Sequence, residues 1–266
     1  MKGIAGYELK NGYYQNRLKM LIGVGVLVFI SYIVIENCMI LYGSGISTGD
    51  CWLYLFSGNP EYKYSSDAEF ELPILWFLFH AYMFFMLCSY PVNDLKKSGI
   101  QSMLFSQNRK KWCISKLLWT IAGVAGFYCM ELGILAVEMF IQSNIFGRKM
   151  IIDLKSDIIG SEWGIMFILP IISDMAIAVF QMMISLYSSY FLAYIASLVY
   201  LILSVYIKTE FMLGNYSMLL RSLIFDIDGL SIRKGILVSL CFIVVSSWLC
   251  VINIRKRDIF DKGLEI

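Results

Sequence analysis

Five ionisable side chains lie inside long apolar runs of the chain. They are Glu36, His80, Glu131, Glu138 and Asp174. Ionisable groups at such positions are rare in membrane segments, and they usually face a cavity or a partner. Glu131 and Glu138 are two helical turns apart, so they share one face of a helix. These groups are the first candidates for a binding site.

Two interpretations of these groups stay open. The functional one is an acidic cavity, in the outer half of a membrane protein, that accommodates a cationic group. Counting 1.5 Å per residue puts Glu36, His80 and Glu131 at similar depth there, with Asp174 nearer the middle. The structural alternative is that His80 bonds to a glutamate, or that the acids are protonated or capped by Ser and Tyr side chains of neighbouring helices.

The sequence offers no catalytic constellation. It has one histidine, no CxxC pair among its seven cysteines and no HExxH motif, so we expect neither a metal site nor a catalytic group. It also lacks GxxxxGK[ST], the loop that cradles nucleotide phosphates. We therefore expect no directly bound cofactor and no enzymatic activity in this chain by itself.

The composition requires a bilayer around much of the surface. Of 266 residues, 59% are hydrophobic and 16% are charged, with a mean hydropathy of +0.69. Soluble domains have about 45–50% apolar and about 25% charged residues. Continuous apolar runs can satisfy their backbone in lipid only as helices, so the sequence predicts an all-α integral membrane protein.

Six transmembrane helices are predicted in a single domain, residues 1–266. The stretch between the third and the last spans is long enough for two crossings, with a hairpin at the polar group 185–190. Residues 1–19 mix tyrosines with basic residues and are expected to form an interfacial helix, an ordinary positive flank being the alternative. The predicted spans are 20–42, 73–90, 115–141, 164–186, 190–207 and 235–254.

Charge asymmetry predicts the orientation. Lys and Arg gather in the terminal segments and between the second and third spans, whereas acids gather in the other long loops, 43–72 and 208–234. We therefore expect a multi-pass protein of the bacterial plasma membrane with both termini in the cytoplasm. An apolar patch at 216–227 is expected to dip back or lie along the outer surface, which is tolerable only where protein or a water-filled cavity covers it.

A basic amphipathic segment, residues 94–112, joins the second and third spans. Ile100, Met103 and Leu104 share one helical stripe, while Lys97 points elsewhere. This pattern favours docking of a helix in a groove of a soluble partner. The alternative is a positive loop that lies on anionic headgroups.

The whole pattern resembles the membrane subunit of type-2 ATP-binding-cassette (ABC) exporters. In that family the loop after span two has a charged residue, a glycine, a short helix, a turn with Ser and Arg, an aromatic residue and a lysine that enters span three. The basic ending at 255–259 also resembles the family. The corresponding loop positions here are Lys97, Gly99, the helix 100–106, Asn108, Arg109, Trp112 and Lys116.

The resemblance implies a coupling helix that seats in a cytoplasmic ABC ATPase. That separate subunit, in two copies, would bind ATP and Mg. A second permease subunit, identical or similar, would complete the pathway in contact with membrane lipids and without nucleic acid. The implied coupling residues are Lys97, Gly99, Ile100, Met103, Leu104, Asn108, Arg109 and Trp112.

The resemblance also implies a cargo. It would be an amphipathic or cationic peptide, such as a toxin or bacteriocin, for export or immunity, and the acids and the histidine inside the spans would line its path. Export of a lipid, glycan or drug is an alternative, and so is a membrane sensor or assembly protein that transports nothing.

Overall fold

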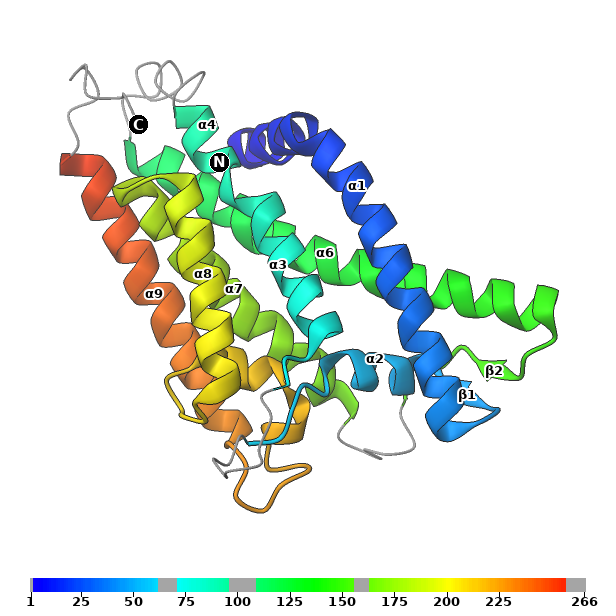
Figure 1. Cartoon of the computed structure of the whole chain (residues 1–266). Coiled ribbons are helices and arrows are strands. Elements are labelled where there is room, and N and C mark those ends of the chain that lie inside the picture. Colours follow the sequence, from blue (N-terminus) through cyan, green and yellow to red (C-terminus); the bar gives the residue numbers. More distant parts are fainter. Residues whose placement is uncertain (1, 62–70, 96–108, 156–162, 257–266) are drawn as a thin grey trace.

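The structure is a computed structural model that describes residues 2–61, 71–95, 109–155 and 163–256. The described chain is almost entirely helical, which confirms the all-α class (Figure 1). Two two-residue strands, one nine-residue helix and two short 3₁₀ helices lie between the longer helices. The elements are α1 (Lys2–Tyr42), β1 (Ile46–Ser47), α2 (Thr48–Phe56), α3 (Ile74–Cys88), α4 (Tyr90–Asp94), α6 (Arg109–Phe146), β2 (Met150–Ile151), α7 (Trp163–Tyr187), α8 (Tyr190–Tyr206), η3 (Leu213–Ser217), η4 (Leu219–Arg221) and α9 (Ile232–Lys256).

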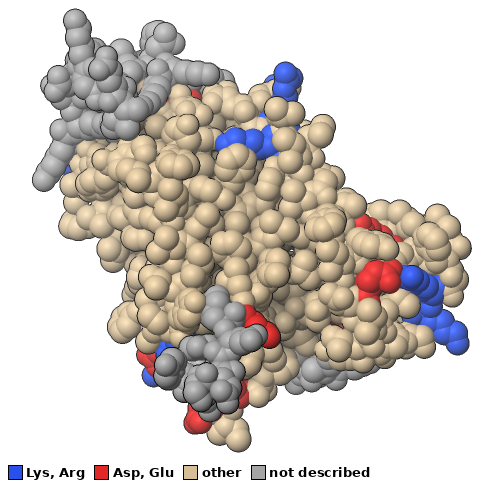
Figure 2. Space-filling model, viewed as in Figure 1, with Lys and Arg blue, Asp and Glu red and all other residues tan. Residues whose placement is uncertain are grey.

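The described helices have the length and composition of membrane helices. Five of them can cross a bilayer by these criteria, and α8, with 17 residues, is a shorter apolar helix. The space-filling view shows a broad uncharged band, with Lys, Arg, Asp and Glu gathered towards its ends (Figure 2). Both observations indicate a helical protein embedded in a membrane. The five long helices are Glu8–Tyr42, Ile74–Asp94, Arg109–Phe146, Gly164–Tyr187 and Ile232–Arg255.

The long helices run up and down one bundle. The start of α1 and the end of α9 lie at the same end of it, beside α4 (Figure 1). We call this the α4 end and the opposite one, which contains α2, β1, β2 and η3, the α2 end. Helix α7 packs against α3, α6, α8, α9 and η3, so it occupies the centre of the bundle.

Helix α1 is continuous over 41 residues, so the segment expected as an interfacial helix at 1–19 runs without a break into the first long apolar run. Its first turns lie across the α4 end before the helix continues along the bundle (Figure 1). Side chains hold this region to α3: Lys19 Nζ donates to Ser89 Oγ at 2.7 Å, and Tyr82 OH donates to the Lys19 carbonyl at 2.5 Å. A side-chain donor on a helix carbonyl competes with the helical ladder, which is one cause of bending.

Helix α6 is longer than the span expected at 115–141. It has 38 residues and therefore extends about 57 Å, far more than the hydrocarbon thickness of about 30 Å. It accordingly runs obliquely to α7 and α9 (Figure 1). Its first turn, from Arg109 to Trp112, falls in the stretch for which the sequence predicts a loop.

The hairpin between α7 and α8 lies where the sequence predicts it. Helix α7 ends at Tyr187 and α8 begins at Tyr190. Ser189 caps α8, because its hydroxyl accepts a hydrogen bond from the Leu192 amide at 3.3 Å. Such a cap satisfies an amide that has no partner within the helix.

Part of the predicted loop 43–72 is folded into the bundle. Ser47 and Asp50 form a capping box that starts α2. Trp52 of this helix donates to the Met166 carbonyl at 3.2 Å, and Phe56 stacks on Tyr128 with ring centroids 5.4 Å apart. Both α2 aromatic side chains are fully buried, so α2 belongs to the core rather than to a surface connector.

The predicted apolar patch at 216–227 also returns to the protein. Its first residues belong to η3 and η4, and Tyr216, Met218 and Leu219 are buried. Trp76 of α3 donates to the Ser217 carbonyl at 3.3 Å. Protein therefore covers the first part of the patch, whereas Leu223 and Ile227 at its later positions are exposed.

Candidate functional site

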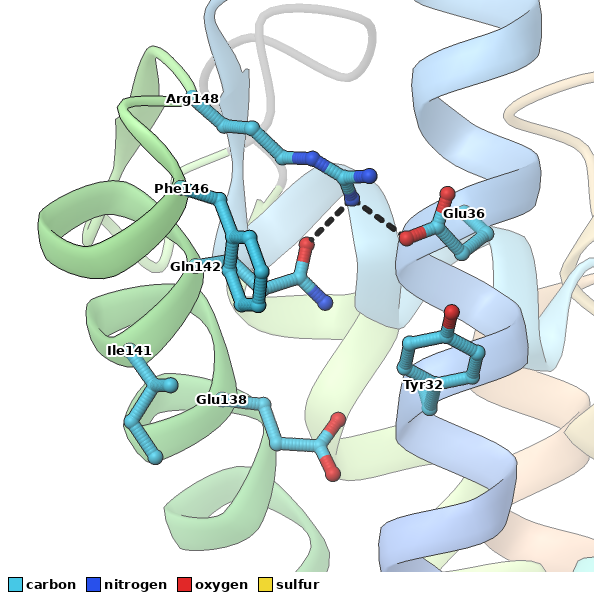
Figure 3. Close-up of a pocket in the computed structure, with 7 residues that line it drawn as sticks. All are labelled: Tyr32, Glu36, Glu138, Ile141, Gln142, Phe146 and Arg148. Atoms are coloured by element: carbon cyan, nitrogen blue, oxygen red, sulfur yellow. Dashed lines mark hydrogen bonds and ion pairs between the residues drawn. The ribbon is translucent and has the colours of Figure 1, made fainter.

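A polar pocket lies between α1 and α6 at the α2 end of the bundle. Its volume is about 290 Å³ (Figure 3). Helix α1 contributes a tyrosine and a glutamate, and α6 with its following turn contributes the rest. The lining residues are Tyr32, Glu36, Glu138, Ile141, Gln142, Phe146 and Arg148.

An ion pair closes one side of this pocket. The Arg148 guanidinium contacts the Glu36 carboxylate and donates to Gln142 Oε1 at 2.8 Å (Figure 3). Both charged side chains are about one-third exposed. The only basic residue of the lining is therefore already paired with one of its two acids.

Glu138 is the acid that remains. Its side chain extends from α6 towards α1 and Tyr32, away from the ion pair (Figure 3). Its Oε2 atom is buried and has no hydrogen-bond partner among the described residues. A buried carboxylate without a donor is costly. Glu138 therefore lines the pocket with a carboxylate of which one oxygen has no donor among the described residues.

The backbone beyond the two helices fixes the pocket. Gly147 has φ +64°, a left-handed conformation that ends α6 and turns the chain back so that Arg148 reaches Glu36. Strand β1 then pairs in parallel with β2, and the Gly45 amide donates to the Lys149 carbonyl at 2.8 Å. The ends of α1 and α6 are thereby joined.

A second polar cluster lies in the middle of the bundle. His80 Nε2 of α3 lies 2.9 Å from Asp174 Oδ2 of α7, and Tyr128 of α6 donates to the same oxygen at 2.5 Å. All three residues are buried among aromatic side chains. The cluster links the central helix α7 to two neighbours.

The hydrogen bonds fix the protons of this cluster. His80 Nδ1 lies 2.6 Å from the Trp76 carbonyl, which can only accept, so Nδ1 carries a proton. The short contact between Nε2 and Asp174 then needs one further proton, on either the imidazole or the carboxyl. The pair is neutral overall in both arrangements, which is the form that an apolar interior tolerates.

The predicted in-span residues thus form separate groups. Sequence analysis put His80 at a depth similar to that of Glu36 and Glu131 and left open that it bonds to a glutamate; in the structure its partner is Asp174 of α7. Glu131 is fully buried and accepts a hydrogen bond from Ser31 at 3.2 Å. For Glu131 and Asp174 the structural alternative, capping by Ser and Tyr of neighbouring helices, is what the structure has.

A third cluster, at the α4 end, surrounds Lys116. Its fully buried ammonium contacts Glu8 of α1 and lies 2.7 Å from Asp94 Oδ2 of α4 and 3.1 Å from Tyr90 OH. Tyr90 in turn donates to Glu8 at 2.8 Å. All three donors of the ammonium have acceptors. This cluster ties α1, α4 and α6 together.

Two of the predicted coupling residues fall within the described chain, and neither is a free surface group. Trp112 is 3% exposed and donates from Nε1 to Asp94 Oδ2 at 3.0 Å. Arg109 donates to the carbonyls of Ile254 and Arg255 at the end of α9. The other predicted coupling residues, Lys97, Gly99, Ile100, Met103, Leu104 and Asn108, lie outside the described residues.

Sequence analysis missed the burial of the charges around Lys116 and also that of Arg221 of η4, which is 1% exposed. Each of its five guanidinium N–H groups donates to an oxygen, mostly of the backbone. Burial lowers its pKa to about 10, well above neutrality, so the guanidinium stays charged. Its role is to hold the α2 end together. The acceptors are the carbonyls of Asn59, Pro60, Ser204 and Val205 and the side chain of Asn215.

Apolar helices that enclose paired charges define this chain as a helical membrane-type protein. It belongs to the family described as "Protein of unknown function (DUF2705)", whose model matches residues 53–260. The matched region begins within α2 and extends past α9, so it includes both buried clusters except Glu8. No curated protein and no solved structure matches the chain.

Proposed function

We propose that the chain is the permease subunit of an ATP-driven exporter. In this proposal α1, α3, α6, α7, α8 and α9 are six spans, and the α4 end faces the cytoplasm. Two such subunits form the pathway, and a separate ATPase in two copies supplies the energy. The resemblance of the whole sequence to type-2 ABC membrane subunits is the starting point.

The alternating helix directions support α8 as a sixth span. Its 17 residues extend about 26 Å, close to the thickness of a hydrocarbon core. Helix α7 ends at the α4 end, and η3, which follows α8, lies at the α2 end (Figure 1). The chain between them therefore runs the length of the bundle, and it does so as an apolar helix.

The observation that carries the proposal is how the basic segment is fastened at both ends. Asp94 is its first residue and Trp112 its last, and the Trp112 indole donates a hydrogen bond to the Asp94 carboxylate. Lys116 connects this point to α1, and Arg109 connects it to α9. A movement of residues 96–108 imposed by a soluble partner would thus be transmitted directly to α1, α6 and α9.

The acidic pocket supports a cationic cargo. Of its three charged lining residues two are acids, and the single base is paired. An amphipathic or cationic peptide carries the complementary charge. Export of a lipid, glycan or drug would need other contacts, and a sensor or assembly protein would need no pathway.

Co-purification with the ATPase encoded nearest to this chain tests the proposal. We expect stoichiometric recovery of the ATPase and hydrolysis that depends on the membrane subunit. Replacing the apolar stripe by Met103→Asp with Leu104→Asp should reduce recovery at least fivefold, since an apolar groove rejects the added charges.

Leu223→Asp provides the matched control. Leu223 is 50% exposed at the opposite end of the bundle, so this change adds a charge without touching the basic segment. Recovery should equal that of the unmodified chain. Absence of any ATPase partner, or equal losses in the stripe variant and the control, would contradict the proposal and favour a protein that does not transport.

A further inference from the structure

We propose that the pocket between α1 and α6 binds the ammonium group of an amphipathic amine, with Glu138 as its counter-ion. The site stands on the geometry of the pocket alone. Only its role as a cargo site rests on the proposed export function.

The charges of the lining favour a cation over an anion. Arg148 is engaged by Glu36 and Gln142, so it offers little to an incoming anion. Glu138 Oε2 has no donor among the described residues. An ammonium group would supply that donor and a compensating charge. Charge-assisted hydrogen bonds of this kind are stronger than neutral ones.

The composition of the lining favours an organic cation over a metal ion. A hard cation needs about six oxygen ligands, and the lining side chains keep fewer than that outside the ion pair: the two carboxylate oxygens of Glu138, the hydroxyl of Tyr32 and the second carboxylate oxygen of Glu36. The volume of about 290 Å³ corresponds to roughly ten water molecules, enough for an ammonium with several carbons. Tyr32 and Phe146 provide aromatic rings for cation–π contact.

The surroundings of the pocket favour a ligand with an apolar tail. Ile141, Phe146 and Tyr32 are 41%, 68% and 54% exposed on the outside of the bundle. Phe29 on α1 and Phe140 on α6 are exposed as well. A tail can therefore lie along these helices while the ammonium enters between them. Apolar surface of this kind contributes affinity without specificity, which leaves discrimination to Glu138.

A binding assay on the isolated chain tests the site. Radiolabelled dodecylamine, which is protonated at neutral pH, is titrated onto the chain in phosphatidylcholine nanodiscs and read by scintillation proximity. We expect saturable binding that Glu138→Gln weakens at least tenfold, because the amide keeps the shape and loses the charge. Glu210→Gln, at an exposed ion pair with Lys234, should bind as the unmodified chain does.

Two further arms keep the test decisive. Tyr32→Leu changes a half-exposed residue and should weaken binding several-fold even if Glu138→Gln folds poorly. Dodecanol should not displace the amine. Equal binding by Glu138→Gln and the unmodified chain, with both well folded, would overturn the site, as would displacement by dodecyl sulfate as effective as by unlabelled amine.

The source of the ammonium is read from the lipid. If phosphatidylethanolamine in the nanodiscs competes with dodecylamine, the site takes a lipid headgroup, and if it does not, the site takes free amphipathic amines. Both outcomes support the ammonium site. Because the assay contains no ATPase, a chain that binds amines but recruits no ATPase would sink the export proposal and leave the site intact.

Discussion

Lys116 Nζ lies 2.7 Å from Asp94 Oδ2, which joins the early part of α6 to the end of α4. The two residues flank a stretch of chain that contains the strongly basic segment. Glu8 completes the contact from α1. A buried cation held by two acids from different helices is a demanding arrangement, because each partner is costly to bury without the others.

Replacing Lys116 by Met should therefore destabilise the chain severely. Two buried carboxylates would face each other without a cation, and breaking a buried ion pair costs about 3–5 kcal/mol. The measurement is thermal unfolding in detergent followed by tryptophan fluorescence. Lys234→Met is the control, since Lys234 is 61% exposed and its ion pair is worth about 1 kcal/mol or less. Similar losses of thermal stability in both variants would contradict the expectation that the buried ion pair stabilises the chain more than the exposed one.

Asp174→Ala should destabilise the chain more than Asp174→Asn does. Asp174→Asn keeps a donor for the imidazole nitrogen and a polar partner for Tyr128, whereas Asp174→Ala leaves both unpaired in an aromatic core. We expect Ala to cost at least about 2 kcal/mol more than Asn, as orphaned buried groups do. Unfolding midpoints of the two variants measure the difference, and equal midpoints would contradict a stabilising role for the contacts that His80 and Tyr128 make with Asp174.

Arg221→Lys should be a damaging substitution in spite of the retained charge. An ammonium has three donors at one point and cannot reach all the oxygens that the guanidinium serves. Each buried carbonyl left without a donor costs about 1–3 kcal/mol. Arg233→Lys, at an exposed position, should leave the unfolding midpoint unchanged. If Arg221→Lys were as stable as this control, the hydrogen bonds of the Arg221 guanidinium would contribute nothing to the stability of the chain.

Gly49→Ala should loosen the α2 end. A Cβ there would lie 2.6 Å from the Leu154 carbonyl oxygen and 2.7 Å from the Lys155 carbonyl, so backbone must shift, at about 1–3 kcal/mol. Gly25→Ala, where no atom lies within 4 Å, should be neutral or slightly stabilising. Limited proteolysis within 150–155 reports the loosening. A Gly49→Ala chain that resists the protease like its control would contradict the close packing.

Hydropathy predicted the helices because each long apolar run needs lipid or protein around it. The break between α7 and α8 was also predictable, since polar residues interrupt the run. Helix α2 was not, because its nine residues are too few for a span and lie in a stretch with acids. Its capping signal at Ser47 and Asp50 was present in the sequence and is the feature that could have revealed it.

The partners of the buried charges were beyond the sequence. The depth of a residue along its helix follows from counting residues. Which helices are neighbours depends on which of their faces pack against each other. Counting therefore gave His80 a depth similar to that of Glu36 but could not name its partner, which is Asp174 because α3 packs against α7. Arg221 was missed for the same reason, because nothing local to η4 indicates acceptors from α8 and the turn after α2.

Helices α1 and α6 are fastened to each other at three levels. Strands β1 and β2 with the Glu36–Arg148 pair hold one extremity, and Glu8 with Lys116 holds the other. Between them Ser31 donates to Glu131. Two helices joined at both ends resist sliding and separating, so we expect α1 and α6 to move together as one rigid unit. A movement of this unit relative to the central helix changes the contact between α6 and α7. The contact between α6 and α7 is apolar near the α4 end. The hydrogen bond from Tyr128 to Asp174 crosses it near the middle of both helices and would have to break in such a movement.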